Sequence, residues 1–250
     1  MAGHSQWANR KHRKARQDAK KGKIFSKMAR EIMVAARQGG DPATNTQLRM
    51  AIERAKQFSV PMENIERAIK RGTGELSGQD FSEAMYEGFG PGGVAIMLRI
   101  LTDNRNRTAA EIRHLFSRYG GGLGESGSVA WLFNRCGLIV LDGSQVADPD
   151  ELLLVAMEAG ADDLRTEGDT YEIITTPDKF EEVKNALAEA GFPEPTNAEV
   201  TYLPTTQTAV AGKEAEQLLR LLDALEDHDD VQDVYANFDM AEEILAAFDG

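Results

Sequence analysis

Residues 138–141 read Leu-Ile-Val-Leu, a short continuous apolar run that is typical of a buried β-strand. The order of segments that follows this run decides the fold. The pattern predicts helices at 149–159 and 177–190, and further strands at 162–165, 170–175 and 198–203. Strand, helix, strand, strand, helix, strand is the order of the ferredoxin-like unit. We therefore expect residues 136–204 to form a ferredoxin-like domain.

The flanking segments on both sides predict one further domain. Before the unit, strands at 84–89 and 94–102 enclose the turn Gly90-Pro91-Gly92-Gly93, and apolar residues alternate along the second strand. The spacing from Thr108 to Glu111 predicts a capping box that opens a helix, and 129–133 predicts another strand. After the unit, a helix at 213–226 and a strand at 231–238 have too few partners to fold alone. We expect 80–135 and 205–250 to form one discontinuous α/β domain, into which 136–204 is inserted.

The first 75 residues have the pattern of a small helical domain. Residues 1–22 read as an arm, and apolar residues then recur at helical spacing from Lys23 to the glycine pair at 39–40. Two more helices are expected at 46–58 and from Pro61 to Gly72. The fold class expected for the whole chain is α+β, with a three-helix domain at 1–75 followed by two α/β domains.

Composition narrows the class of protein. The 250 residues include 28% charged and 42% hydrophobic residues and one cysteine, Cys136, so neither a disulfide framework nor a cysteine-based zinc site is expected. The sequence has no apolar run of about 18 residues, so no membrane span is expected. The pattern favours a cytoplasmic protein; an arginine-rich mitochondrial presequence is the alternative for the first residues.

Charge is divided unevenly along the chain. Residues 1–75 hold 17 lysines and arginines against 7 acidic residues, whereas residues 136–250 hold 5 against 28. An acidic body repels phosphate and a basic end attracts it, so such a molecule approaches a polyanion in one orientation. This division predicts a nucleic-acid-binding surface at the N-terminus.

The basic run supplies most of the expected binding residues. Its nine cations between 10 and 27 are interrupted by one acid, Asp18. They are Arg10, Lys11, Arg13, Lys14, Arg16, Lys20, Lys21, Lys23 and Lys27. Trp7 and His4 precede them: Trp7 either stacks on a base or anchors the arm by packing, and His4 either pairs with phosphate or packs on the backbone. The competing interpretation of the whole run is a solvated surface that binds nothing.

A second candidate phosphate site lies at Asp103-Asn104-Arg105-Asn106-Arg107-Thr108, where a strand gives way to a helix. Amides at the helix start, together with Arg105 and Arg107, could hold one phosphate. Alternatively, this is a capped loop whose arginines pair with neighbouring acids. The residues alone leave both alternatives open.

Catalytic and cofactor motifs are not found in the sequence. Two Gly-x-Gly-x-x-Gly patterns, starting at Gly88 and Gly122, do not lie between a strand and a helix start, so we expect turns. Nothing near Cys136 in sequence activates it, and His114 lies on a helix face. Asp227-His228-Asp229-Asp230 could bind a divalent cation weakly, but it lacks the ligand spacing and the glycine of a calcium loop. We expect a non-catalytic protein without metal or cofactor. A protein-interaction scaffold, with the arm passive, is a further alternative.

Several motifs in the same order resemble the YebC/PmpR family across essentially the whole chain. They are Met1-Ala2-Gly3-His4-Ser5-Gln6-Trp7-Ala8-Asn9, Lys21-Gly22-Lys23-Ile24-Phe25, Tyr86-Glu87-Gly88-Phe89-Gly90-Pro91-Gly92-Gly93, Thr102-Asp103-Asn104-Arg105-Asn106-Arg107-Thr108 and Gly124-Glu125-Ser126-Gly127-Ser128-Val129. One departure is Gln6, where the family commonly has lysine, which removes one possible phosphate contact.

The resemblance implies a helical N-terminal domain followed by two α/β domains. It also implies a regulator of gene expression: either a DNA-binding transcriptional regulator or a translation factor that helps ribosomes through proline-rich stretches. In the second case, the N-terminal region would contact ribosomal RNA of the large subunit. Neither composition nor spacing chooses between these partners, and the oligomeric state is not predicted.

Overall fold

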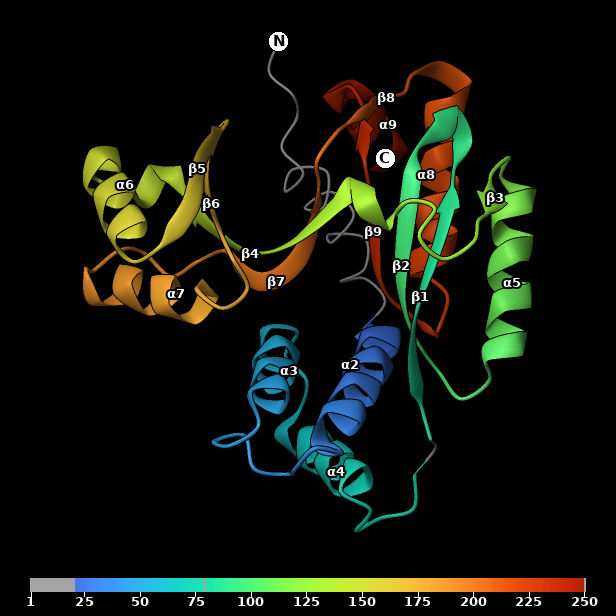
Figure 1. Ribbon diagram of the computed structural model, residues 1–250, viewed down its shortest axis with the longest axis horizontal. Coiled ribbons are helices and arrows are strands. Elements are labelled where there is room, and N and C mark those ends of the chain that lie inside the picture. The colour runs from blue at the N-terminus through green and yellow to red at the C-terminus, as the bar shows by residue number, and fades with distance from the viewer. Residues whose placement is uncertain (1–20, 79, 250) are drawn as a thin grey trace. The chain divides into compact units, whose positions relative to one another are not determined.

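The computed structural model describes residues 21–78 and 80–249 (Figure 1). They form two compact units. One unit is the segment Trp131–Thr206, and the other contains the described residues before and after it. The expected insertion is confirmed, because the chain leaves the second unit at Ala130 and returns to it at Gln207. The three-domain boundaries at 1–75, 80–135 with 205–250, and 136–204 stay a prediction.

The helical part of the second unit has three helices, α2 (Lys21–Ala36), α3 (Thr46–Gln57) and α4 (Met62–Gly72). Ile32, Leu48 and Ile65, one from each helix, are fully buried in a common apolar core. Asn45 caps α3, because its side chain accepts a hydrogen bond from the Leu48 N–H at 3.0 Å. Gly72 lies so close to the Met33 carbonyl of α2 that a side chain there would collide with the backbone. The expected three-helix arrangement is therefore present in the described residues.

The sheet of the same unit has the order β3-β1-β2-β9. Its strands are β1 (Ser82–Phe89), β2 (Ala95–Thr102), β3 (Gly122–Leu123) and β9 (Val231–Ala236). β2 pairs antiparallel with both β1 and β9, which confirms that the late strand completes the earlier sheet. A short 3-10 helix, η1 (Pro91–Gly93), makes the β1–β2 connection. The long-range β2–β9 pair encloses the entire inserted segment.

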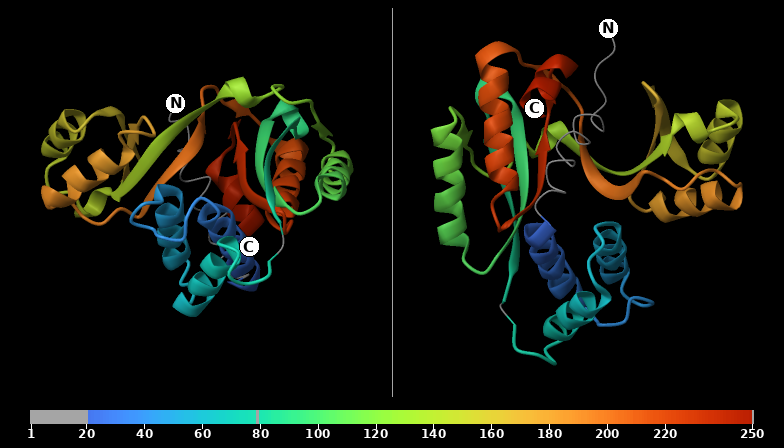
Figure 2. Two further views of the ribbon diagram at one scale, coloured as in Figure 1. Left: turned by 60° about the horizontal axis from the view of Figure 1, so that its bottom comes forward. Right: turned by 180° about the vertical axis from the view of Figure 1, so that it is seen from behind.

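Helices α5 (Arg105–Arg118) and α8 (Gly212–Glu226) lie on one face of this sheet (Figure 2). Alternate residues of β2, namely Ile96, Leu98 and Ile100, are fully buried against them. The parallel pair β8 (Thr208–Ala209) and β10 (Phe238–Asp239) and the helix α9 (Glu242–Asp249) complete the unit. The sequence pattern did not predict α9.

A buried carboxylate fixes the loop after β3. Glu87 of β1 is 4% exposed and accepts hydrogen bonds from the backbone N–H groups of Gly127, Val129 and Ala130 at 2.7–2.8 Å. Burial disfavours the charged form of Glu87, but these three donors outweigh it and hold the pKa of Glu87 below its usual value. The strand expected at 129–133 was wrong, since most of this segment is the 3-10 helix η2 (Ala130–Leu132), and the next strand begins only at Phe133.

The unit Trp131–Thr206 has the expected strand and helix order. Its strands are β4 (Phe133–Asp142), β5 (Ala161–Glu167), β6 (Thr170–Thr175) and β7 (Asn197–Pro204), and its helices are α6 (Pro149–Glu158) and α7 (Phe180–Glu189). A short 3-10 helix, η3 (Gly143–Gln145), follows β4. The sheet order β5-β6-β4-β7, antiparallel at every pair, is that of a ferredoxin-like sheet. The predicted fold class is confirmed.

Candidate nucleic-acid interface

Most of the predicted arm lies outside the described residues. This applies to His4, Trp7, Arg10, Lys11, Arg13, Lys14, Arg16 and Lys20. The described part begins at Lys21, the first residue of α2. A nucleic-acid role for these residues stays a prediction. Among the predicted site residues, the structure describes the side-chain contacts of Lys23, Lys27, Arg105 and Arg107.

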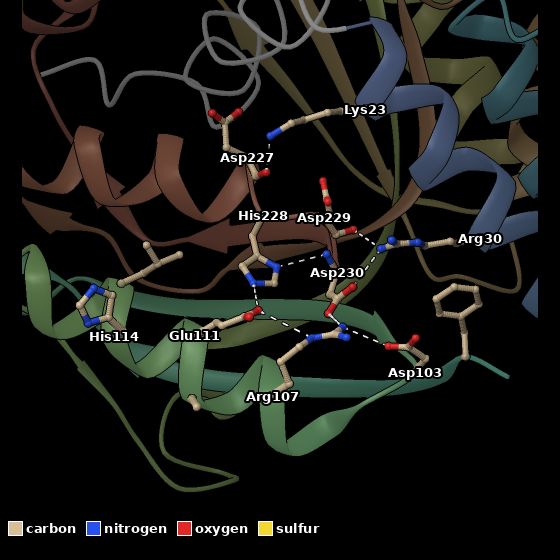
Figure 3. A pocket seen from close by; sticks show the side chains of 13 residues that line it. Lys23, Arg30, Asp103, Arg107, Glu111, His114, Asp227, His228, Asp229 and Asp230 are labelled. Carbon is tan, nitrogen blue, oxygen red and sulfur yellow. Dashed lines mark hydrogen bonds and ion pairs between the residues drawn. The ribbon is translucent and has the colours of Figure 1, made fainter. Parts of the chain in front are cut away.

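One face of α2 contacts the acidic loop between α8 and β9. Lys23, Lys27 and Arg30 are four and three residues apart, so they share one helix face. The Lys23 ammonium donates to the Asp227 carbonyl at 3.0 Å, and that of Lys27 donates to the Glu226 carbonyl at 2.5 Å. Arg30 donates to the Asp229 carbonyl and, at 3.0 Å, to the Asp230 carboxylate (Figure 3). This face of α2 is therefore engaged with the chain's own acidic loop.

Lys27 requires a correction, because it was expected to meet phosphates at the surface. Its side chain is buried, at 9% exposure. Burial lowers the pKa of Lys27 to about 8, although Glu226, Asp233 and other nearby acids partly oppose this shift. Its ammonium donates to the Glu226 carbonyl, so in this arrangement Lys27 is engaged with the protein's own acidic loop.

The Arg105 and Arg107 side chains are also held by groups of the protein. Arg105 donates to the Ser82 hydroxyl at 3.0 Å and to the Glu83 carbonyl at 2.8 Å. Arg107 pairs with Asp103 at 3.0 Å and with Asp230 at 2.7 Å. These contacts favour the alternative in which the loop is capped and its arginines pair with acids. The capping box expected at Thr108 was wrong: α5 begins at Arg105, capped by the Asn104 side chain, which accepts from the Arg107 N–H at 3.1 Å.

The loop and the α2 face meet around a cleft of about 830 Å³. Asp230 lies at its centre and accepts from Thr108, Arg107 and Arg30 at 2.7, 2.7 and 3.0 Å (Figure 3). Burial disfavours the Asp230 carboxylate, but these donors and the two guanidinium charges hold its pKa below the usual value. We call the side chains around this cleft the open cluster. Its members are Arg30, Asp103, Arg107, Glu111, His228 and Asp230.

Glu111, His228 and Asp230 bring three possible metal ligands within 4.8 Å of one another. Their hydrogen bonds fit a different role. The Asp230 N–H donates to His228 Nδ1 at 3.1 Å, so in neutral His228 the proton is on Nε2, which lies 2.9 Å from Glu111 Oε2. A metal at Nε2 would need that nitrogen free of its proton and Nδ1 protonated. The arrangement is that of a hydrogen-bonded pair.

A second charge cluster was not predicted from the sequence. Arg99 of β2 lies opposite Asp233 of β9, and its Nε donates to the Asp233 carboxylate at 2.6 Å. Arg54 of α3 donates to the other oxygen of Asp233, while Glu31 of α2 accepts from Arg99 at 2.9 Å and from Arg54 at 3.4 Å. We call Glu31, Arg54, Arg99 and Asp233 the closed cluster. It attaches two helices to the sheet through two cations and two anions.

Three further cations missed by the sequence analysis are exposed on the helical part. Lys56 lies on α3, while Lys70 and Arg71 lie in the last turn of α4. All three lie on polar helix faces within the basic first 75 residues, and this pattern could have indicated them. They were missed because they lie outside the dense basic run at 10–27. They are exposed cations of the helical part outside the predicted arm.

The two residues considered for catalysis belong to different units. Cys136 is buried in β4 of the inserted unit, whereas His114 is exposed on α5 of the other unit. Among the described residues, no helix is both long enough and apolar enough to cross a membrane.

Comparison with known proteins identifies the family. Residues 5–75 match the family model described as the TACO1/YebC protein N-terminal domain, and residues 81–238 match the TACO1/YebC second and third domain. A protein of Thermotoga petrophila is 55% identical over 255 residues, with 100% of both chains covered. One of Carboxydothermus hydrogenoformans is 55% identical, covering 97% of this chain and 100% of its own. Both bear the name "Probable transcriptional regulatory protein".

A solved structure gives the same result. The crystal structure of a conserved hypothetical protein from Aquifex aeolicus has a TM-score of 0.80 and 48% identity to this chain. It covers 91% of this chain and 94% of the other. On the two family models and these relatives, the chain belongs to the TACO1/YebC family.

Proposed function

We propose that this chain is a non-catalytic, nucleic-acid-binding regulator of gene expression, and that it acts as a ribosome-associated translation factor on proline-rich stretches. The observation that carries the nucleic-acid part is the uneven charge: residues 1–75 carry 17 cations and 7 acids, and residues 136–250 carry 5 and 28. Contacts between cations and phosphates release condensed counterions and supply most of the sequence-independent affinity. The translation part rests on the family resemblance.

The internal contacts of the protein narrow the set of residues that we propose to bind nucleic acid. Lys23 and Lys27 donate to the acidic loop, and Arg105 and Arg107 donate to groups of the protein. The binding energy is therefore assigned to the arm, from Arg10 to Lys21, with His4 and Trp7 at its tip. The exposed cations Lys56, Lys70 and Arg71 are added on the helical part.

The test is salt-dependent binding to large ribosomal subunits and to duplex DNA. If about six phosphates are engaged on a duplex, the slope of log K against log salt is about −5. Reversing the charge of Arg13, Lys14, Lys20 and Lys21 to glutamate is expected to weaken binding by ~100-fold or more at moderate salt. The matched control reverses the four cations of the inserted unit: Arg135, Arg165, Lys179 and Lys184. Equal losses in both variants, or affinity that does not depend on salt, would refute the proposal.

A second candidate function is DNA-binding transcriptional regulation through the same surface. It is favoured by the name of the relatives, which are called transcriptional regulatory proteins. The strongly acidic second half of the chain opposes wrapping by duplex DNA, since it adds like charge near the phosphates. Sedimentation of lysate through sucrose separates the two functions: comigration with the large subunit supports translation, and a free pool that protects a promoter supports transcription.

A further inference from the structure

Helix α6 presents an apolar surface to solvent that the proposed function does not use. Leu152 and Ala156 are buried beneath the helix, which packs on β5 and α7. On the outside, Leu153, Leu154 and Met157 are 44, 62 and 47% exposed. Leu153 and Met157 are one turn apart and Leu154 adjoins them, so the three side chains form one patch. We call it the α6 patch.

Carboxylates border the α6 patch. Asp150, Glu151 and Glu158 lie on the same helix, all exposed, and α6 has no basic residue. The whole unit Trp131–Thr206 contains 16 acidic residues and 4 lysines or arginines. A partner that buries the leucines must therefore bring positive charge to the rim.

We propose that the α6 patch docks a basic amphipathic helix of a protein partner. The apolar stripe of that helix would cover Leu153, Leu154 and Met157, and lysines or arginines flanking the stripe would pair with Asp150, Glu151 and Glu158. Helix-on-surface docking of this kind relies on apolar residues at spacings of three and four. Methionine suits such a surface because its unbranched, polarisable side chain adapts to different partners.

The charge around the α6 patch favours a basic helix over two other occupants, a second copy of the chain and a nucleic acid. A second copy docking through the same patch would place the carboxylate rims against each other, which is unfavourable. Nucleic acid offers phosphates, which the same carboxylates repel. A cationic helix removes both conflicts and buries the exposed apolar area.

The test uses the full chain and a dye-labelled 18-residue peptide of leucine and lysine, arranged as an amphipathic helix. Its control has the same composition, scrambled so that the leucines no longer share one face. We expect micromolar binding of the amphipathic peptide and at least tenfold weaker binding of the scrambled one. Equal affinity for the two peptides would overturn the proposal, because it would show attraction by net charge alone.

Variants locate the site. Leu153→Gln, Leu154→Gln and Met157→Gln together keep helix propensity while removing the apolar patch, and we expect them to weaken peptide binding at least tenfold. Met62→Gln with Leu76→Gln is the matched control, since both residues are exposed apolar side chains of the other unit. Circular dichroism establishes that each variant folds. Unchanged peptide affinity in the folded triple variant would overturn the proposal, as would a dimer of the wild-type chain that the triple variant loses.

This inference can fail independently of the proposed function. The triple variant keeps all cations of residues 1–75, so its affinity for ribosomal subunits or DNA is expected to stay within about twofold of wild type. A parallel loss of nucleic-acid affinity would show that the patch belongs to the nucleic-acid interface, which would also overturn the docking proposal.

Discussion

The closed and open clusters both connect the helical part to the sheet, but they handle charge differently. In the closed cluster, Asp233 and Arg99 have side chains that are 9 and 18% exposed, and the cluster's two cations face two anions with little access for water. In the open cluster, the Asp230 side chain is only 5% exposed, but its partner Arg107 is 44% exposed at the edge of the cleft. A carboxylate in the closed cluster must be neutralised by its neighbours. In the open cluster, the partners of the carboxylate can turn to water instead.

The largest effect is expected from Asp233→Asn, which keeps the shape and removes the charge. Arg54 and Arg99 would then lose the anion that accepts from both at short range, keeping Glu31 and, for Arg99, the exposed Glu83 at 3.6 Å. An undercompensated buried charge costs about 3–5 kcal/mol. Burial opposes the Asp233 carboxylate, but Arg54 and Arg99 hold its pKa well below the usual range. Its contribution to stability is thus complete above the unfolded pKa and is lost as pH falls toward the folded one. Urea unfolding near pH 7 measures the loss.

The control for this prediction replaces the pair. Arg99→Met with Asp233→Leu leaves no unpaired partner on the two strands, so it should recover part of the stability lost in Asp233→Asn. A loss below about 1 kcal/mol in Asp233→Asn would show that water reaches the closed cluster, and the contrast with the open cluster would disappear.

This network also marks the limit of prediction from sequence. The alternation of Ile96, Leu98 and Ile100 correctly predicted one buried face of β2, because strand periodicity is local. Arg99, on the opposite face, donates to Asp233, which lies 134 residues later in the sequence. The entire inserted unit separates the two residues along the chain. Nothing in the neighbouring sequence indicates that pair, or the pairing of β2 with β9 that creates it.

The candidate site shows the same division between local and long-range information. The spacing of Lys23 and Lys27 predicts that they share one helix face. The acidic loop that accepts their hydrogen bonds lies about 200 residues later in the sequence. Strand β4 runs unbroken from Phe133 to Asp142, although Asn134 and Gly137 interrupt its apolar pattern, because β7 pairs along its length. The start of α5 was misplaced by four residues, because Asn104 and not Thr108 is its N-cap.

A second prediction concerns Lys27, whose side chain is buried and whose ammonium donates to the Glu226 carbonyl. Its pKa is about 8 in the folded chain, below the ordinary 10.5, so the unfolded chain binds more protons between these values. Stability should therefore rise with pH through this window. Relative to Lys27→Met, the free energy of unfolding of wild type is expected to increase by roughly 2 kcal/mol from pH 7.5 to 9.5. Urea titrations of both proteins at several pH values measure this; parallel curves would contradict a buried, charged Lys27.

A third prediction sets Asp230→Asn directly against Asp233→Asn. Asparagine can still accept from Thr108, while Arg30 and Arg107 can turn toward water in the cleft. We expect a loss of about 1–2 kcal/mol, clearly smaller than that of Asp233→Asn. The same urea titration compares the two variants. If the two losses were equal, access to the cleft would not moderate the cost of removing a carboxylate.

The smallest effect is expected at the rim of the open cluster. Arg107→Gln removes ion pairs to Asp103 and Asp230, but the Arg107 side chain is 44% exposed, and such pairs contribute less than about 1 kcal/mol. The screening length of salt falls from about 10 Å at 0.1 M to about 3 Å at 1 M, so the difference from wild type should shrink further in 0.5 M sodium chloride. Asp233→Asn should keep most of its loss at the same salt, because its partners are shielded from ions. Thermal unfolding of both variants at low and high salt provides the comparison, and a salt-sensitive Asp233→Asn beside a salt-insensitive Arg107→Gln would reverse the assignment of closed and open.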